Sequence, residues 1–260
     1  MADTKISALT LVSAGDAAQE FAVNEAGTSK KMTSAQVKTF ANTAPLFTAG
    51  TASAGTHPRF AAGTLLTTPE VGAAEYDGTT LHFTNSSANR ALLAPSYWRV
   101  LDANATGQNV ATAQPWFPSL GAVTLLANTC YFFEGAFASA RTLGTTSHTT
   151  AHIFGGTCTV TAIRWFVNVK EGDAASITDS DLVSSLIFNN TVTIKAASAS
   201  ATENIVYQVW GHIWVSTAGT FIPQFQYSVA PGGAPSIYTG TYFKICPIGS
   251  DTFTSMGPWA

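Results

Sequence analysis

The chain contains few charged residues. Asp, Glu, Lys and Arg make up 10% of its 260 residues, against about 25% in typical soluble domains. The formal net charge is -3, and the longest basic run is Lys30-Lys31. Binding to nucleic acid requires clustered Lys and Arg, so we do not expect it. Because charge keeps protein surfaces apart, its scarcity favours large protein–protein contacts.

Long apolar runs and paired cysteine motifs are also missing. No stretch approaches the roughly 18 apolar residues that cross a bilayer, and the first 20 residues lack a basic start followed by an apolar run. We therefore expect neither membrane insertion nor a cleaved export signal. The three cysteines, Cys130, Cys158 and Cys246, stand singly. They are predicted to be buried free thiols made in a reducing cytoplasm, with one disulfide and an odd thiol as the alternative.

Catalytic motifs are equally sparse. His148 and His152 are four residues apart, but in a strand or loop this spacing spans about 13 Å, and no acidic residue lies between them. Ser147 would point away from its neighbour His148 in a strand, and no G-x-S-x-G motif is present. The histidines are therefore predicted to be structural or exposed, with a metal site as the alternative.

Acidic residues form no motif of a known site. A glycosidase needs two carboxylates in one groove, and the sequence does not pair the candidates Glu75, Glu134 and Glu203. The densest acidic stretch could hold calcium but lacks EF-hand spacing, which favours a solvated loop. Its members are Glu171, Asp173, Asp179 and Asp181. We predict no catalytic residue, no metal site and no cofactor.

The first 41 residues form a distinct segment. Alternating residues and the turn letters "NEAGTS" predict a hairpin over residues 20–32. Thr33 precedes Gln36 by three residues, so it is a candidate N-cap for a helix over "SAQVKTFA". The apolar residues are too few for an independent core, so we expect them to contact another chain. They are Phe21, Val23, Val37 and Phe40.

The middle of the chain is less regular. Residues 42–70 are rich in Thr, Ala, Gly and Pro and indicate a linker or extended wrap. Asp77-Gly78 lies between two short alternating runs, which predicts a hairpin in a small module ending near Arg99. The expected divisions are an attachment segment at 1–41, a linker with hairpin module at 42–118, and a β-sandwich domain at 119–260.

Six strand-like segments follow residue 119, separated by turn clusters and without a long helical pattern. In "TFIPQFQYSV", Phe221, Phe225, Tyr227 and Val229 fall on one face and polar residues on the other. This pattern predicts an all-β fold with a C-terminal antiparallel sandwich of the jelly-roll type. The segments are "AVTLLANTCYFFEGAFASA", "TCTVTAIRWFVNV", "TVTIKAAS", "NIVYQVWGHIWVST", "TFIPQFQYSVA" and "TYFKICPIG".

One predicted strand is apolar on both faces. In "VYQVWGHIWV", one face carries Val209, Ile213 and Val215, and the other carries Trp210, His212 and Trp214. A two-layer sandwich covers one face only, so the aromatic face is predicted to be a subunit interface. The tryptophans at positions 116, 165, 210, 214 and 259 could instead line a sugar site, but most are predicted to lie in the core or an interface.

The N-terminal sequence resembles a segment of tailed-bacteriophage fibre and minor structural proteins. The resemblance comprises an "ISxL" start, a "D-x-F-x-V" strand, a "G-x-x-K-K" turn and a "T-x-x-Q" helix, with "AAQE" lengthening the approach to Phe21. "EYDGTTLHFTNSSANRALL" looks like a second piece of the same proteins, and the C-terminal stretch from "GTFIPQFQYSV" resembles the end of phage virion proteins. The matching residues are Lys5, Ile6, Ser7, Leu9, Asp16, Phe21, Val23, Gly27, Lys30, Lys31, Thr33 and Gln36.

This resemblance implies a non-enzymatic virion protein. The expected assembly is a homotrimeric short fibre, spike or knob, made in the bacterial cytoplasm and joined through its N-terminus to tail, baseplate, portal or capsid proteins. Contact with a host-surface glycan is a further expectation. The alternatives are a capsid decoration or head-fibre protein, a carbohydrate-binding module acting alone, and a polysaccharide-degrading enzyme.

Overall fold

The computed structural model describes residues 20–25, 28–33, 60, 62–172, 179–185 and 188–252. These residues form the strands β1 to β18 and contain no helix, which confirms the all-β prediction. None of them forms a helix long and apolar enough to cross a membrane. The chain divides into two compact units, residues 1–59 and residues 60–260.

The first unit contains the predicted hairpin. β1 (Glu20–Glu25) pairs antiparallel with β2 (Thr28–Thr33), with Phe21 opposite Met32 and Val23 opposite Lys30. Thr33 is the last residue of β2. The predicted helix beyond it, with Val37 and Phe40, lies outside the described residues, so this part of the attachment segment stays a prediction.

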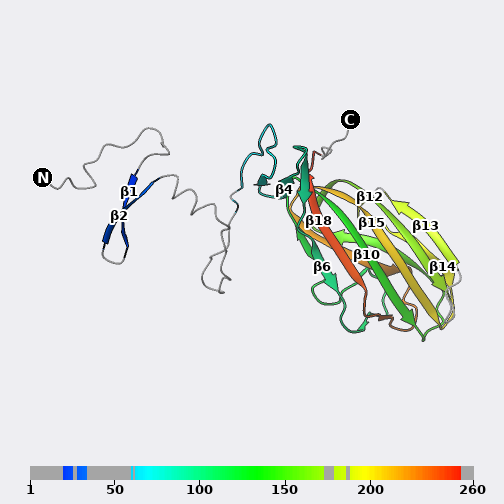
Figure 1. Cartoon of the computed structure of the whole chain (residues 1–260). Helices are drawn as coiled ribbons and strands as arrows, with labels where there is room; N and C mark the ends of the chain where they lie inside the picture. Colours follow the sequence, from blue (N-terminus) through cyan, green and yellow to red (C-terminus); the bar gives the residue numbers. More distant parts are fainter. Residues whose placement is uncertain are drawn as a thin grey trace, which may run out of the picture. The chain divides into compact units, whose positions relative to one another are not determined.

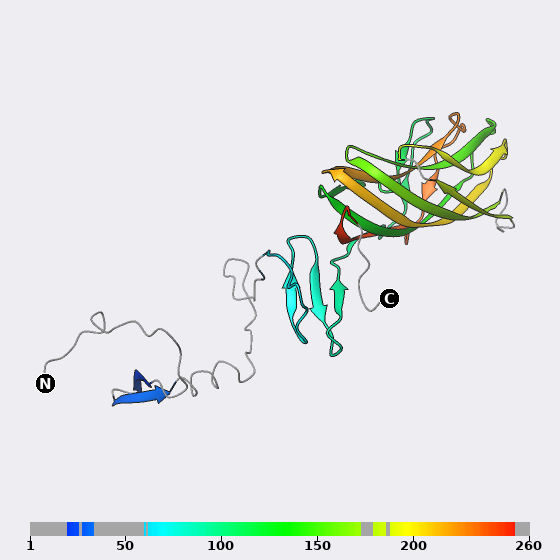
Figure 2. The ribbon, with the colours of Figure 1, turned by 90° about the horizontal axis from the view of Figure 1, so that it is seen from above.

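The second unit begins with a three-stranded antiparallel sheet, drawn in cyan and green in Figure 2. Its strands are β3 (Ala74–Tyr76), β4 (Leu81–Thr84) and β5 (Arg90–Leu93). The predicted Asp77-Gly78 turn joins β3 to β4. Gly78 has a φ of 99°, which favours glycine, and the Asp77 carboxylate accepts hydrogen bonds from the amides of Thr79 and Thr80 at 2.8 and 2.6 Å.

Two antiparallel sheets form the β-sandwich (Figure 1). The eight-stranded sheet has the order β13-β12-β15-β10-β17-β7, with β18 pairing β10 and β6. Its members are β6 (Tyr97–Val100), β7 (Ala105–Thr106), β10 (Thr129–Arg141), β12 (Thr159–Gly172), β13 (Asp179–Ser185), β15 (Glu203–Thr217), β17 (Ser236–Ile237) and β18 (Tyr242–Ser250).

The smaller sheet has five strands in the order β14-β11-β16-β8, with β9 also pairing β16. They are β8 (Gln114–Pro115), β9 (Val123–Leu125), β11 (His148–Gly156), β14 (Val192–Ser198) and β16 (Gly219–Tyr227). Aromatic rings join the two sheets. Phe133 of β10 contacts Phe154 of β11 and Phe221 of β16, with ring centroids 4.9 and 5.6 Å apart.

The predicted alternation is confirmed in β15, where Val209, Ile213 and Val215 are buried in the core. Gly211 lies between them because a side chain has no room there. A Cβ at this position would lie 2.2 Å from the Arg164 carbonyl oxygen and 2.8 Å from the Phe133 ring. The ring of Phe133 therefore occupies the space of the missing side chain.

In β16 the prediction is confirmed for Phe221, Phe225 and Tyr227, which are buried. It is wrong for Val229, which is 48% exposed. β16 ends at Tyr227, so Val229 lies in the following bend, where strand alternation no longer decides which side chains face the core.

The sandwich also includes strands that precede residue 119. β6, β7 and β8 lie within residues 97–115, and each pairs with a sandwich strand. With two to four residues each, they are too short to show a period of two. The three cysteines are free and buried, as predicted.

Candidate functional site

The outer face of the eight-stranded sheet carries a row of aromatic and charged residues from five neighbouring strands. Phe166 of β12 lies opposite Trp210 of β15, and Trp210 lies opposite Glu134 of β10. Glu134 in turn lies opposite Lys244 of β18, which lies opposite Trp98 of β6. Strands are about 4.8 Å apart, so this outer-face row extends over about 19 Å.

The two ends of the outer-face row are aromatic and exposed. Phe166 and Trp210 stack with centroids 5.8 Å apart and an interplanar angle of 22°, and they are 43% and 37% exposed. At the other end Trp98 is 58% exposed and stacks on Tyr242 at 5.8 Å. Large apolar surfaces left open on a sheet face mark contacts with another molecule.

Charged groups occupy the middle of the row. The Lys244 ammonium donates to the Glu134 carboxylate at 3.2 Å and lies 5.2 Å from the Trp98 ring centroid. Both contacts hold the Lys244 side chain against the sheet. The row therefore presents two hydrophobic ends with hydrogen-bonding groups between them.

The predicted interface residues Trp210, His212 and Trp214 all lie on this face. His212 packs against Phe132 with ring centroids 5.4 Å apart, and partial burial lowers the pKa of its imidazole. The Arg164 guanidinium carbon lies over Trp214, 5.5 Å from the centroid of the indole ring. Their grouping follows the predicted alternation, while their role as a subunit interface stays a prediction.

Sequence reasoning missed Phe166 and Trp98 as members of this surface. Each lies on a different strand from Trp210, and only the strand register brings the three into one row. The letters "SYWRV" around Trp98 hold two adjacent aromatic residues in a short extended run, which is the one local signal of an exposed aromatic position. Phe166 has the same signal, because it directly follows Trp165 in "IRWFVNV".

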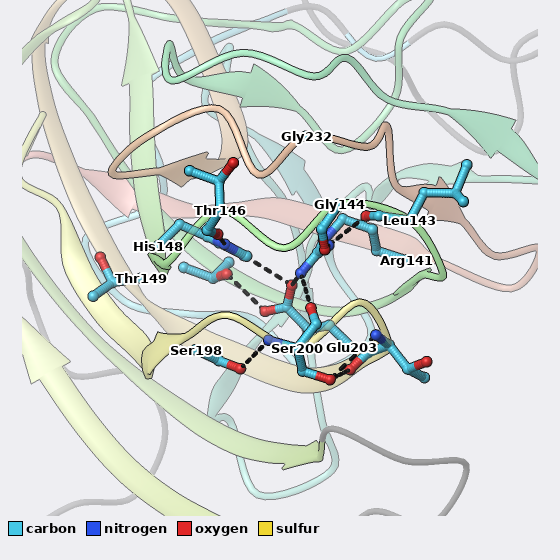
Figure 3. A network of polar contacts seen from close by, with 12 residues as sticks. Arg141, Leu143, Gly144, Thr146, His148, Thr149, Ser198, Ser200, Glu203 and Gly232 are labelled. Carbon is cyan, nitrogen blue, oxygen red and sulfur yellow. Dashed lines mark hydrogen bonds and ion pairs between the residues drawn. The ribbon is translucent and has the colours of Figure 1, made fainter.

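A second polar cluster is buried inside the sandwich (Figure 3). Arg141 and His148 both point toward the Glu203 carboxylate, with donor–acceptor distances of 3.2 and 3.0 Å. The Thr150 hydroxyl donates to the other carboxylate oxygen at 3.1 Å. These side chains come from β10, β11 and β15, and all are buried.

The remaining donors of this cluster bind backbone carbonyls. Arg141 donates to the carbonyl oxygens of Leu143, Gly144 and Ser200. The Nδ1 of His148 lies 2.8 Å from the Thr146 carbonyl oxygen, so both ring nitrogens of His148 have an oxygen within hydrogen-bond distance. The cluster thus joins two loops to three strands. It satisfies its own hydrogen bonds internally, which favours a structural role over a catalytic one.

His152 has a different environment from His148. Its Nδ1 lies 3.0 Å from the Tyr207 hydroxyl, and it packs edge-on against Phe154 and Trp165. Burial lowers the pKa of His152 to about 3, with a smaller opposing effect from the backbone of Gln224. No group of three or more metal-binding side chains occurs among the described residues.

The three glutamates considered for glycosidase chemistry lie in separate places. Glu75 pairs with Arg90 in the three-stranded sheet, Glu134 pairs with Lys244 on the outer face, and Glu203 belongs to the buried cluster. The structure therefore does not bring them together. In the acidic stretch, Glu171 lies opposite Asp179 in the β12–β13 register, and Asp173 lies outside the described residues.

The tryptophans divide between the core and the outer face. Trp116 and Trp165 are fully buried, as predicted for core residues. Trp210 and Trp214 lie on the outer face, and Trp259 is outside the described residues. Trp116 and Trp165 therefore cannot belong to a sugar site, because no ligand can reach these buried side chains.

Comparison with known proteins identifies no family for this chain. No family model and no curated protein matches the chain. Among solved structures, one similar chain is "TmCBM61 in complex with beta-1,4-galactotriose", with 14% sequence identity. The match covers 50% of this chain and 86% of that chain, with a TM-score of 0.25. A likeness this low supports no conclusion about ligand or function.

We expect E203Q to destabilise the sandwich by about 3–5 kcal/mol, because it leaves the Arg141 guanidinium buried without its anion. Urea unfolding followed by tryptophan fluorescence measures the change. E134Q is the matched control. It breaks a partly exposed pair, which contributes below about 1 kcal/mol. A loss of stability for E203Q no larger than that for E134Q would contradict the structural role of the cluster.

We also expect acid to destabilise the protein through His152. The pKa of His152 is about 3 in the folded state and about 6.5 in an unfolded chain, so the unfolded state takes up the proton first. The contribution of His152 to the stability is therefore fully present above about pH 6.5 and is lost as the pH falls toward 3, by at most about 1.4 kcal/mol per pH unit. Unfolding free energies between pH 7 and 4 should show a shallower slope in H152F. Equal slopes in both proteins would assign the acid sensitivity to other groups.

Proposed function

We propose that the chain is a non-enzymatic structural protein of a bacteriophage particle, a compact trimeric fibre or knob whose subunits meet through the outer face of the eight-stranded sheet. The observation that carries this proposal is the exposed, stacked pair Phe166 and Trp210 at one end of the outer-face row. The remaining support comes from the resemblance of the sequence to phage structural proteins.

The chemistry of the face favours a protein partner. Interfaces are enriched in aromatic residues and Arg, and this end of the face combines Phe166 and Trp210 with Trp214 beneath Arg164. Val206, on the same strand as Trp210, is also 36% exposed. Covering these side chains removes apolar area from water and stabilises an assembly. A chain with 10% charged residues opposes such contact weakly.

The first compact unit fits the role of an attachment segment. It is separate from the sandwich unit, and its two described strands form a two-stranded hairpin, which is marginally stable in isolation. Contact with tail, baseplate, portal or capsid proteins would supply the missing stabilisation. Phe21 and Val23 of β1, together with Val37 and Phe40, are the residues proposed for this contact. A capsid decoration or head-fibre protein would use the segment in the same way.

A carbohydrate-binding module is the second candidate. The observation in its favour is the other end of the outer-face row, where the 58% exposed Trp98 lies beside the Lys244–Glu134 pair. An exposed indole can stack on the apolar face of a sugar ring while charged groups bind its hydroxyls. Under this alternative the protein is a monomer with affinity for a glycan, and within the virion proposal the same end could contact the host surface.

W210D should dissociate the proposed trimer, because a carboxylate within the contact would be buried without a partner. Size-exclusion chromatography with light scattering measures the change. The expected result is a trimer for the wild type and a folded monomer for W210D. L143D is the control, because Leu143 is 69% exposed and lies off this face.

Two outcomes would contradict the trimer interface. One is a W210D protein that remains a stable trimer. The other is a wild-type monomer that is retarded in affinity electrophoresis through a host polysaccharide and loses this retardation in W98A but not in L143A. The second outcome would establish the carbohydrate-binding alternative.

Removal of residues 1–50 should leave the sandwich folded and trimeric with a nearly unchanged melting temperature, while particles fail to incorporate the shortened protein. Three copies emerging from one axis act at a shared effective concentration, so weak docking of each copy still holds the assembly. Phage complementation followed by immunoblotting of purified particles measures incorporation. Normal incorporation of the shortened protein would place the attachment elsewhere in the chain.

A further inference from the structure

A cavity of about 310 Å³ opens at the edge of the sandwich, away from the buried cluster of Glu203. It lies between β6 and β18 of the larger sheet and β9 of the smaller sheet, next to the loop that follows Phe117. This volume is at the lower end of the range for small-molecule sites. Most of the wall is apolar, with contributions from Phe117, Val123, Pro223, Phe243 and Ile245.

Arg99 is the only charged side chain among the described residues that line this cavity. It lies opposite Phe243 in the β6–β18 register. Since cross-strand partners share a sheet face and Phe243 is a buried core residue, Arg99 faces the interior side. Its guanidinium carbon is 5.8 Å from the Phe117 ring centroid, so the charged group lies against an aromatic wall.

The hydrogen-bonding capacity of Arg99 is largely unused. Its Nη2 donates one long bond, 3.4 Å, to the Ser119 carbonyl oxygen. Its Nε is shielded from solvent and has no hydrogen-bond partner among the described residues. By contrast, Arg90 and Arg141 each pair with a glutamate, whereas no carboxylate pairs with Arg99 in the described part of the chain. A shielded Nε–H without an acceptor is unfavourable, so a guanidinium in this arrangement is suited to an anionic ligand.

The rim of the cavity has a second unusual feature. Leu120 has a φ of 55° and is 81% exposed. The left-handed backbone region is unfavourable for a bulky residue. Because the Leu120 side chain is exposed, burial of apolar area does not offset this cost. Backbone of this kind is typical of ligand-binding loops. The rim therefore adds an open apolar side chain beside the mouth of the cavity.

We propose that this cavity binds a small organic carboxylate with an apolar body, with Arg99 pairing the carboxylate and the aromatic and aliphatic walls enclosing the body. The planar guanidinium can donate two parallel hydrogen bonds to a carboxylate. A neutral alcohol of similar shape offers one oxygen and no negative charge, so it can accept a hydrogen bond but cannot form the two-point ion pair with the guanidinium. Ligand charge therefore decides affinity at this site.

This cavity borders the outer-face row, because Trp98 belongs to the row and also lines the cavity, whereas Trp210 and Phe166 do not line it. Along β6, Tyr97 and Arg99 lie opposite the core residues Ile245 and Phe243, whereas Trp98 lies opposite Lys244 on the outer face. Substitutions can therefore address the cavity without changing Trp210. The cavity can bind its ligand whether or not the sandwich forms a trimer, so the two proposals fail independently.

Titration of the full-length protein with 3-phenylpropionate, followed by isothermal calorimetry and ¹H–¹⁵N spectra, tests the site. The matched neutral probe is 3-phenylpropanol. We expect saturable binding of the carboxylate, with shifted amide signals at Arg99, Val123 and Phe243, and at least tenfold weaker binding of the alcohol. Absence of carboxylate binding, or equal affinity for both probes, would overturn the proposal.

Two variants locate the binding site. R99Q should weaken 3-phenylpropionate at least tenfold while leaving the weak binding of the alcohol unchanged, and A122F should weaken both probes because Ala122 lines the cavity. R164Q is the matched control, because it removes a guanidinium that stacks on Trp214 at the outer face. Loss of carboxylate affinity in R164Q equal to that in R99Q would show a nonspecific charge effect and refute the site.

Discussion

The aromatic core between the two sheets is the constraint on which the rest of the structure depends. Phe133, Phe154, Phe221 and Phe243 lie in mutual contact, with centroid distances between 4.7 and 6.2 Å. Rings of this size leave little room for misplacement, because protein interiors are packed as densely as organic crystals. Gly211 shows the consequence: the central strand β15 lacks a side chain where the Phe133 ring lies against it. The register of β10 and β15 is thereby fixed.

Once that register is fixed, the distribution of polar groups follows from it. One end of the interior holds the cluster around Glu203, in which Arg141 and His148 find their partners within the fold. Binding to other molecules must then use surfaces outside the packed core. These are the outer-face row with Trp210 and Trp98, and the edge cavity with Arg99. The first suits extended contact with a large partner, and the second suits a small ligand.

The sequence predicted the sandwich, and in long strands it also predicted well which side chains face the core and which face outward. Trp210, His212 and Trp214 were assigned to the outer face by alternation alone, because side chains in a strand alternate with a period of two. The same rule failed at Val229, which lies beyond the end of β16. It could not identify β6 to β8, since two to four residues show no period. Trp98 and Arg99 were missed as site residues for that reason.

The sequence by itself determined the all-β class, the hairpins at residues 20–33 and at Asp77-Gly78, the free buried cysteines and the apolar character of both faces of β15. These features depend on neighbouring residues in the chain, and local composition and alternation express them. Only the tertiary structure decided that Phe166, Trp210 and Trp98 share one row, that Glu203 pairs with Arg141, and that Arg99 faces a cavity without a carboxylate. Such contacts join residues tens of positions apart, and strand order and register, which place them, are set by packing of the whole core.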